Sequence, residues 1–391
     1  MYRNSYALVN KSRLKDNIRE IKEKYPDYEY YFGVVKNNCY HHGIGAVEAL
    51  LAGGINYLCV SSLDEGMQIR EKYSSIPILV LEPIDSQYIS VAIENKITIT
   101  VDALDFVKEL VSMRLKDKLL IHIKLDTGMN RLGFKDKNDL EEAYSLLKEN
   151  KHIVVEGIYT HFATSGRGDI FYERQLKCLE DLLSVIPYEE IPIRHFDRSI
   201  TFVSHKKINF SNGIRLGIMM YGFNESVSVN TRGLKNYLRK VRRNMLLKKG
   251  LIHEYTTENN LQLNTAYSLY SSIISVRPVK VGEFVGYNAS YQVLDDGYIA
   301  TIQIGYADGV TKEFGIVVID GEYYPIVADT MDMIMIFSKK SLKVGSLVEI
   351  IGPNRSVRDV ARALGTNSYH LFTRITSRVP IIYEELENEK E

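Results

Sequence analysis

The sequence has few cysteines, no long apolar run and no net charge, and each absence excludes a class of protein. Its three cysteines, Cys39, Cys59 and Cys178, are scattered and show neither a disulfide framework nor the spacing of a zinc site. No apolar run approaches the ~20 residues of a membrane-spanning helix. The first residues are too polar for a secretory signal. We therefore expect a cytoplasmic protein that holds no metal and spans no membrane.

Positive and negative charges balance, with 49 Lys+Arg and 49 Asp+Glu among 391 residues. A chain without net charge has no general attraction to a polyanion, so we expect no nucleic-acid partner. The exception is the run 234–249, which holds seven basic residues and no acidic one. Such a run is compatible with a nucleic-acid or membrane patch. The simpler interpretation is a basic surface helix that acidic surface elsewhere balances.

The chain before Tyr221 alternates between short apolar runs and longer stretches with helical spacing, such as Ser12–Tyr25 and Leu140–Asn150. The runs are continuous rather than alternating, as buried parallel strands are. There are eight of them: Tyr31–Val35, Tyr57–Val60, Ile78–Leu81, Ile97–Val101, Leu119–Lys124, Ile153–Tyr159, Ile193–Phe196 and Ile214–Ile218. Eight strand–helix repeats predict an N-terminal (β/α)8 TIM-type barrel. A doubly wound open sheet is the alternative.

The pattern changes after Tyr221, first to polar, irregular sequence and then to short strands separated by Gly, Asn and Asp turns. This pattern of short strands and turns predicts a mostly β C-terminal domain. We divide the chain into a barrel at 10–228, a basic and polar connecting segment at 229–265, and a β domain at 266–391, which residues 1–9 join. Val357–Leu364 is a short predicted helix, and Glu384–Glu391 an acidic tail.

Several polar residues follow the predicted barrel strands, at the end where barrels place their functional groups. Lys36 comes directly after the first strand. Burial lowers the pKa of a lysine and frees its amine as a nucleophile, although a lysine here can also simply extend out of the strand end. Ser199, Gly217 and Ile218 offer a hydroxyl and backbone N–H groups after the last two strands, where barrels commonly bind phosphate. A lysine beside a phosphate site suggests pyridoxal phosphate held as a Schiff base.

Motifs that follow one another along nearly the whole chain strengthen this interpretation. They are Phe-Gly-Val-Val-Lys36-Asn-Asn-Cys-Tyr40-His-His-Gly, Lys124-Leu-Asp-Thr-Gly-Met-Asn-Arg131-Leu-Gly-Phe, Thr160-His161-Phe-Ala, Arg215-Leu-Gly-Ile-Met-Met-Tyr221-Gly, Gly286-Tyr287-Asn-Ala-Ser-Tyr, Ile304-Gly-Tyr306-Ala-Asp-Gly, Met331-Asp332 and Ser377-Arg-Val-Pro. Each motif alone is a weak signal. Together, in this order across two domains, they resemble the motifs of the alanine racemase family.

The resemblance implies a barrel that binds pyridoxal 5′-phosphate and a β domain that carries a second catalytic base. By matching position, it implies that Lys36 is the aldimine lysine and one base, and that Tyr287 is the other base. It also implies that Arg215 faces the pyridine nitrogen and that His161 supports Arg215 and Tyr287. The remaining implied roles are phosphate binding by Tyr40, Ser199, Gly217, Ile218 and Tyr306, substrate contact by Arg131 and Met331, support by Asp332, and carbamylation of Lys124 to pair with Arg131.

The chemistry of racemisation agrees with these roles. The α-proton must leave one face and return on the other, which calls for two bases. Arginine does not give up its proton at working pH, so Arg215 would leave the pyridine nitrogen unprotonated. This makes the ring a weaker electron sink and disfavours transamination. A tyrosine with a pKa near ~10 needs nearby positive charge to act as a base, and Arg215 acting through His161 would supply it.

Three positions depart from the family pattern: Arg198 where Asn is usual, Thr330 where Cys is common, and Ser377 where some members carry Tyr. A small Ser377 near the substrate would leave room for a hydroxyl or a longer side chain. We therefore predict a racemase for alanine, or alternatively for serine or a broader set of amino acids. The resemblance implies a homodimer with shared active sites that serves D-alanine supply for the cell wall.

Two other classes of protein remain as alternatives. A pyridoxal-phosphate decarboxylase of the ornithine/diaminopimelate kind shares the barrel-plus-β plan, but its C-terminal cysteine-aspartate site is missing from the sequence, and Arg215 argues against the strong electron sink it uses. A non-enzymatic cofactor-binding protein would have no use for the β domain that supplies Tyr287.

Overall fold

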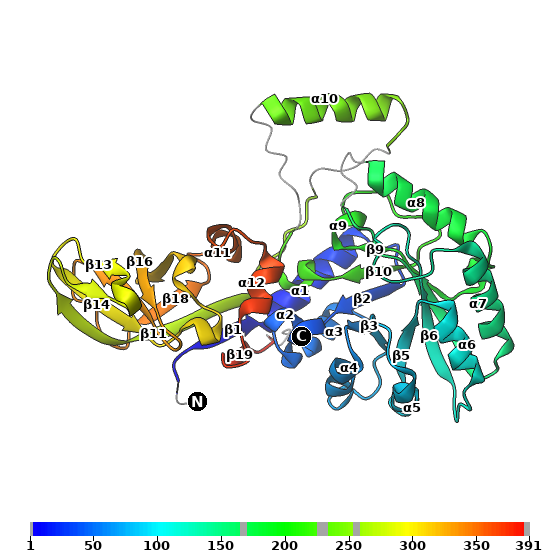
Figure 1. The fold of residues 1–391 in the computed structure, drawn as a ribbon, viewed down its shortest axis with the longest axis horizontal. Helices are drawn as coiled ribbons and strands as arrows, with labels where there is room; N and C mark the ends of the chain where they lie inside the picture. The colour runs from blue at the N-terminus through cyan, green and yellow to red at the C-terminus, as the bar shows by residue number, and fades with distance from the viewer. Residues whose placement is uncertain (1–2, 165–169, 225–233, 253–258, 387–391) are drawn as a thin grey trace, which may run out of the picture. The chain divides into compact units, whose positions relative to one another are not determined.

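The computed structural model of the protein describes residues 3–164, 170–224, 234–252 and 259–386 (Figure 1). Residues 229–233 and 253–258 of the predicted connecting segment, and 387–391 of the predicted acidic tail, lie outside these ranges. The chain forms two compact units. The barrel unit comprises Lys15–Asn37 and Leu50–Asn264, and the β unit comprises Met1–Leu14, Asn38–Ala49 and Thr265–Glu391.

A sheet of nine strands forms the barrel unit within the described residues. The strands are β2 (Tyr30–Val34), β3 (Tyr57–Val60), β4 (Ile78–Val80), β5 (Ile97–Val101), β6 (Leu119–Lys124), β7 (Ile153–Tyr159), β8 (Ile193–His195), β9 (Asp197–Arg198) and β10 (Gly213–Leu216). Their order is β8-β7-β6-β5-β4-β3-β2-β10-β9, and all pairings are parallel.

The strand order confirms the predicted barrel. The order steps from each strand to the next along the chain, with no reversal inside the sheet of the kind that a doubly wound fold has. Because β9 follows β8 after Phe196 alone, the chain itself joins the two edges and nearly closes the barrel. The eight predicted runs correspond to β2–β8 and β10. The two-residue β9 is too short to stand out as an apolar run.

Helices surround the barrel strands because each helix buries an apolar stripe against them. In α7, the stripe consists of Leu140, Ala143 and Leu147, and Asp136 caps the helix by accepting hydrogen bonds from the first-turn N–H groups. The helices around the strands are α1 (Lys11–Lys24), α3 (Val47–Gly53), α4 (Leu63–Arg70), α5 (Ile89–Glu94), α6 (Leu104–Ser112), α7 (Lys137–Glu149), α8 (Ile170–Leu183) and α9 (Ser199–Phe202), with short 3-10 turns η2 (Ser86–Tyr88), η3 (Tyr188–Glu190) and η4 (Ile218–Tyr221). The helix α10 (Leu234–Lys248) differs, because its Leu238, Val241 and Met245 are exposed. Figure 1 shows α4 to α8 on the outside of the strands.

The short helix α2 (Lys36–His41) is a left-handed turn. All residues from Asn37 to His41 have φ between 51° and 60°. A left-handed conformation costs roughly 1–2 kcal/mol for each residue with a side chain, so the surroundings must hold this turn in place. Cys39 is fully buried, and the N–H of Gly43 closes the turn on the carbonyl of Asn38. Lys36 therefore stands at the start of a strained turn, a feature that often marks functional sites.

The β unit is mostly β-structure, as predicted. Its large sheet has the order β14-β17-β16-β15-β18-β11-β1-β19, with β14 also pairing with β11. Its strands are β1 (Tyr6–Asn10), β11 (Tyr267–Val279), β14 (Gly297–Ile302), β15 (Ile316–Ile319), β16 (Glu322–Asp329), β17 (Ile334–Ser338), β18 (Leu347–Ile351) and β19 (Ile381–Glu384). The short strands β12 (Phe284–Val285) and β13 (Tyr291–Gln292) form a separate two-stranded sheet. The N-terminal strand β1 pairs antiparallel with β11 and parallel with β19.

Short helical segments complete the β unit. They are η1 (Ile44–Ala46), η5 (Tyr287–Ala289), η6 (Tyr306–Asp308), η7 (Lys312–Phe314), α11 (Val357–Ala363) and α12 (Ser368–Arg374), together with most of α2. The predicted helix is α11, whereas α12 was not predicted. In the ranges that the structure describes, no helix is long and apolar enough to cross a membrane. Nor does any group of three or more His, Cys, Asp and Glu side chains there have the arrangement of a metal site.

Candidate active site

The carboxyl ends of the barrel strands carry most of the predicted site residues. Lys36 follows β2, Lys124 is the last residue of β6, and His161 lies just beyond β7. Arg215 lies within β10, which leads into Gly217 and Ile218, and Ser199 directly follows β9. The carboxyl ends of parallel barrel strands meet at one mouth. These residues therefore converge on the end of the barrel at which such folds do their chemistry.

Arg215 is a buried cation whose position the backbone fixes. Its guanidinium donates to the carbonyl oxygens of Thr160 (2.5 Å), Phe196 (3.4 Å) and His195. It also donates to Nδ1 of His195 (2.9 Å) and lies 5.2 Å from the centre of the Tyr159 ring. None of these partners is a carboxylate. Burial lowers the pKa of Arg215, but an arginine stays protonated throughout the working range of an enzyme.

Positive charge gathers around His161. The pKa of its imidazole lies well below the ordinary value, mainly because the ring is desolvated and further because Arg215, Arg198, Arg131 and Lys124 all disfavour a proton there. The neutral ring is then surrounded by four cationic side chains. Such a mouth attracts anionic groups such as a phosphate or a carboxylate.

Lys124 is the cation most affected by this crowding. Burial, followed by repulsion from Arg131 and Arg215, lowers the pKa of its amine to about 8. Its Nζ lies 5.4 Å from the centre of the Tyr159 ring. A lysine with this pKa has a substantial fraction of free amine near neutral pH, and the free amine is the form that reacts with electrophiles such as carbon dioxide.

Asp126 shapes the loop that carries Arg131. Its carboxylate accepts hydrogen bonds from the backbone N–H groups of Gly128 (2.9 Å), Asn130 (3.0 Å) and Arg131 (3.1 Å). Gly133, at φ 122°, closes the loop, and a Cβ at this position would lie 2.6 Å from the backbone nitrogen of Asp126. The loop therefore requires both the aspartate and the glycine of the motif, which explains their spacing.

Ser199 and Gly217 form the start of an anion site. The Ser199 hydroxyl accepts a hydrogen bond from the N–H of Gly217 (2.9 Å), which brings together the ends of β9 and β10. Arg198 anchors this corner, since its Nε donates to the carbonyl of Phe162 (2.9 Å). A hydroxyl, neighbouring backbone N–H groups and surplus positive charge are a donor set that fits a phosphate group.

The other predicted residues lie in the β unit. Tyr40 is buried, with its ring 6.0 Å from that of Tyr369 in α12. Tyr306 lies next to Met331, because the N–H groups of Tyr306 and Ala307 donate to the carbonyls of Thr330 (3.1 Å) and Met331 (3.0 Å). The predicted site residues thus form two groups, one in each unit.

Three predicted residues of the β unit are unusually exposed for large side chains. The exposed fractions are 70% for Tyr287, 46% for Tyr306 and 54% for Met331. Asp332, beside Met331, accepts a hydrogen bond from Nη2 of Arg378 (2.6 Å). Tyr287 begins η5 after Gly286, where φ is 83° and a Cβ would lie 2.7 Å from that of Ala328.

Three polar residues inside the barrel belong to none of the sequence motifs: His195, whose imidazole contacts Arg215, and His122 and Glu156, which lie further along the same hydrogen-bond chain. The signal that could have found them is a polar residue inside an apolar strand. His122 interrupts LLIHIK and Glu156 interrupts IVVEGIY. A buried polar group in such a place needs hydrogen-bond partners, so these interruptions point to a polar network inside the barrel.

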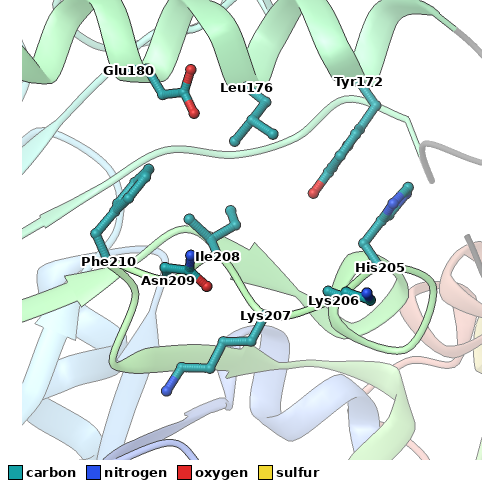
Figure 2. Close-up of a pocket in the computed structure, with 9 residues that line it drawn as sticks. All are labelled: Tyr172, Leu176, Glu180, His205, Lys206, Lys207, Ile208, Asn209 and Phe210. Carbon is teal, nitrogen blue, oxygen red and sulfur yellow. The ribbon is translucent and has the colours of Figure 1, made fainter. Parts of the chain in front are cut away.

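A separate cavity of about 410 Å³ lies on the flank of the barrel unit, between α8 and the segment 205–210 (Figure 2). The rings of Tyr172 and His205 stack at its edge, with centroids 4.0 Å apart. The lining residues are Tyr172, Leu176, Glu180, His205, Lys206, Lys207, Ile208, Asn209 and Phe210. No predicted site residue lines this cavity, and it is not the candidate active site.

A barrel mouth with a strand-end lysine, a buried arginine and an anion site has the features of a pyridoxal-phosphate-dependent enzyme. Comparison with known families identifies the family within this class. Residues 9–225 match the model described as "Alanine racemase, N-terminal domain", and residues 266–383 match "Alanine racemase, C-terminal domain". The chain belongs to the alanine racemase family.

Individual proteins are similar to this chain over almost their whole length. An alanine racemase of Streptococcus gordonii is 34% identical, with 98% of this chain and 99% of that protein covered. The crystal structure of alanine racemase from Bacillus anthracis with bound L-Ala-P has a TM-score of 0.86 at 29% identity, covering 98% and 96% of the two chains. A histidine racemase from Leuconostoc mesenteroides subsp. sake has a TM-score of 0.84 at 26% identity, covering 98% and 99%.

Proposed function

We propose that this protein interconverts L- and D-alanine. The observation that carries the proposal is the arrangement at the barrel mouth, where Lys36, the buried Arg215 and the Ser199–Gly217 corner belong to one set of strand ends. The match of both family models and the full-length similarity to alanine racemases support it.

The cofactor of the family is pyridoxal 5′-phosphate, which withdraws electrons from the α-carbon of an amino acid when bound. In this chain, Lys36 would attach it, and Arg215 would donate to its ring nitrogen. Ser199, Gly217 and Ile218 would hold the phosphate, joined by Tyr40 and Tyr306. The hydroxyl and N–H donors around Ser199 and the surrounding positive charge favour an anionic group of this kind.

The two proposed bases are Lys36 and Tyr287, which come from different units of the chain. Each would hold or release a proton on its own side of the α-carbon, so that the proton removed by one base is replaced by the other. Arg131 and Met331 would border the substrate, and Arg131 would attract its carboxylate. Asp332 and, in its carbamylated form, Lys124 would support them.

Arg215 determines which reaction the site favours. An arginine donates to the ring nitrogen but does not transfer its proton. Opposite Arg215, a bound pyridoxal ring would be a weaker electron sink than it would be opposite a carboxylic acid. Return of the proton to the α-carbon is therefore favoured over transamination.

We further propose that the protein is a homodimer in which each active site is shared. Tyr287, Tyr306 and Met331 are highly exposed for large side chains with proposed roles, as expected if a second copy covers them. The proposal includes a cytoplasmic location, a role in D-alanine supply for the cell wall, and the division of the chain into a barrel (10–228), a connecting segment (229–265) and a β domain (266–391, joined by 1–9).

A second candidate function is racemisation of serine or of a broader set of amino acids. Ser377 is small where some relatives carry tyrosine, and a neighbour of similar fold is a histidine racemase. A chiral assay of the purified protein with L-alanine, L-serine, L-histidine and the other L-amino acids separates these candidates. Lys36→Ala serves as the inactive control. Absence of any D-amino acid, with cofactor bound, would overturn both proposals.

A further inference from the structure

A chain of buried hydrogen bonds runs from Arg215 through the inside of the barrel to Glu156. Nη1 of Arg215 lies 2.9 Å from Nδ1 of His195. Nε2 of His195 lies 2.8 Å from Nδ1 of His122, and Nε2 of His122 lies 3.1 Å from Oε2 of Glu156. Both imidazoles are fully buried. The four residues come from β10, β8, β6 and β7, so the chain links β10 to β8 and β8 to β6 inside the barrel and ends on β7, the neighbour of β6.

The chain has one direction. An arginine only donates, so Nδ1 of His195 must accept, and a neutral His195 then carries its proton on Nε2. The Nε2–H of His195 donates a hydrogen bond to Nδ1 of His122, so the proton of a neutral His122 is on Nε2. The Nε2–H of His122 in turn donates a hydrogen bond to the carboxylate of Glu156, which stays ionised. One arrangement of protons therefore satisfies every bond, with two neutral imidazoles between a fixed cation and a fixed anion.

The ionisation of the three titratable members agrees with this arrangement. Burial lowers the pKa of both imidazoles and keeps them neutral. Burial alone would raise the pKa of Glu156, but hydrogen bonds from His122, Tyr57 and Thr98 hold it below its ordinary value. Oη of Tyr57 lies 2.7 Å and Oγ1 of Thr98 lies 3.2 Å from the same carboxylate oxygen.

Neighbouring side chains lock both rings in orientation. His195 lies between two aromatic rings, with Phe32 at 4.3 Å and Tyr159 at 4.7 Å, each inclined by 16°. His122 pairs in register with Gly157 of β7, where a Cβ would lie 2.5 Å from the imidazole. A glycine is therefore required opposite His122. Packing therefore fixes the orientation of both imidazoles. We call the chain Arg215–His195–His122–Glu156 the relay.

We propose that Glu156 and His122 are positioning residues for the racemase reaction. Glu156 keeps the protons of His122 and His195 on Nε2. The unprotonated Nδ1 of His195 then accepts from Arg215 and holds its guanidinium in place. Glu156 thus ends the hydrogen-bond chain of Arg215 on a carboxylate, in addition to the buried Asp197, whose charge acts on Arg215 without a direct hydrogen bond. This inference rests on the proposed function and adds residues remote from the barrel mouth to it.

Glu156→Gln tests the proposal because it keeps the shape of the side chain and removes its charge. We expect kcat to fall by about tenfold or more, which corresponds to about 1.4 kcal/mol, while KM changes by less than about threefold. We also expect weaker binding of pyridoxal phosphate in a fluorescence titration. The matched control is Glu349→Gln, a buried carboxylate of β18 that accepts from the N–H groups of Asn354 and Arg355. It should leave all three quantities unchanged.

A second variant guards against misfolding of the first. Tyr57→Phe removes one hydrogen bond from Glu156 and should raise the pKa of the carboxyl. The acid limb of the kcat/KM profile should then move to higher pH. Unchanged kcat in Glu156→Gln together with an unmoved acid limb in Tyr57→Phe would overturn the proposal.

Nitrogen-15 NMR of labelled histidine provides a readout independent of catalysis, and the chain has only nine histidines. We expect His195 and His122 to carry their protons on Nε2 in the wild-type holoenzyme, and the His122 signals to change in Glu156→Gln. A proton on Nδ1 of either ring in the wild type would refute the relay. If the protein racemises no amino acid, the proposed function is wrong. The NMR spectra and cofactor titrations would still show whether the relay exists and whether Glu156 affects cofactor binding.

Discussion

Lys124 lies in surroundings that disfavour its positive charge. Its pKa falls from an ordinary 10.5 to about 8 through burial and repulsion from Arg131 and Arg215. A lowering of this size corresponds to roughly 3 kcal/mol, and solvent at the barrel mouth reduces the net penalty to about 1–3 kcal/mol. Lys124→Met removes the charge and keeps the length of the side chain. We expect the variant to be more stable than the wild type by that amount at pH 7 in carbon-dioxide-free buffer.

The sign follows from proton linkage. Between pH 8 and 10.5 the unfolded chain holds the Lys124 proton and the folded chain has lost it, so wild-type stability rises with pH there. The advantage of Lys124→Met should therefore be complete below about pH 8 and vanish near pH 10.5. Near pH 7.5 about a quarter of the Lys124 amines are neutral, against about a thousandth for an ordinary lysine, so the amine is available for carbamylation.

Added bicarbonate tests whether Lys124 changes from a cation to an anionic carbamate. A carbamate is an anion and would attract Arg131 instead of repelling it. Added bicarbonate should thus raise the melting temperature of the wild type but not of Lys124→Met, and carbon-13 bicarbonate should give a carbamate NMR signal only in the wild type. A wild type already as stable as the variant without carbon dioxide, and indifferent to bicarbonate, would refute the reasoning.

Four further predictions concern the proposed site. The purified protein should be yellow, and borohydride reduction with peptide mapping should place the pyridoxyl group on Lys36; an adduct on another lysine would contradict this assignment. Arg215→Glu should lower racemisation by orders of magnitude and raise transamination products, because a carboxyl lets the ring nitrogen hold a proton; an unchanged rate would exclude the role. Ser377→Tyr should reduce serine racemisation more than alanine racemisation, and equal losses would show that Ser377 does not limit the pocket. Lys36→Ala and Tyr287→Phe homodimers should be nearly inactive, whereas a mixed dimer, isolated with two affinity tags, should regain activity in its one intact site. A mixed dimer that holds cofactor and is no more active than its parents would show that Tyr287 does not act across the interface.

Local sequence was sufficient for the barrel because buried parallel strands are continuous apolar runs, which stand out from the amphipathic helices between them. All eight runs became strands of one parallel sheet. The charge pattern predicted a basic helix in the run 234–249, and Leu234–Lys248 form α10. The argument from apolar runs has limits. It failed for β9, since a strand of two residues has no periodicity, and for the left-handed turn of Asn37–His41. Asn and His adopt positive φ more readily than most residues, but as single residues, so a run of five at positive φ is selected by tertiary packing.

Local sequence also reveals some residues of the candidate site and not others. Lys36, Ser199, Gly217 and Ile218 could be found because their positions after the strands follow from the order of the elements along the chain. The role of Arg215, which lies inside β10, came from the family resemblance. Tyr287, Met331 and the other β-unit residues could be listed only through the family resemblance, because their neighbours in sequence are ordinary turn residues.

The relay from Arg215 to Glu156 was decided by tertiary structure alone. Its members lie in four strands, and taken singly a histidine or glutamate within an apolar run shows only that a partner is needed. Which partner it finds depends on register: pairing of β6 with β7 sets His122 opposite Gly157, where the missing side chain leaves room for the ring. The sequence by itself determined which residues are strands and which strand ends carry chemistry, since both follow from local pattern. Closure of the barrel decided which buried polar groups meet, because hydrogen bonds between strands distant in sequence exist only once register and closure are fixed.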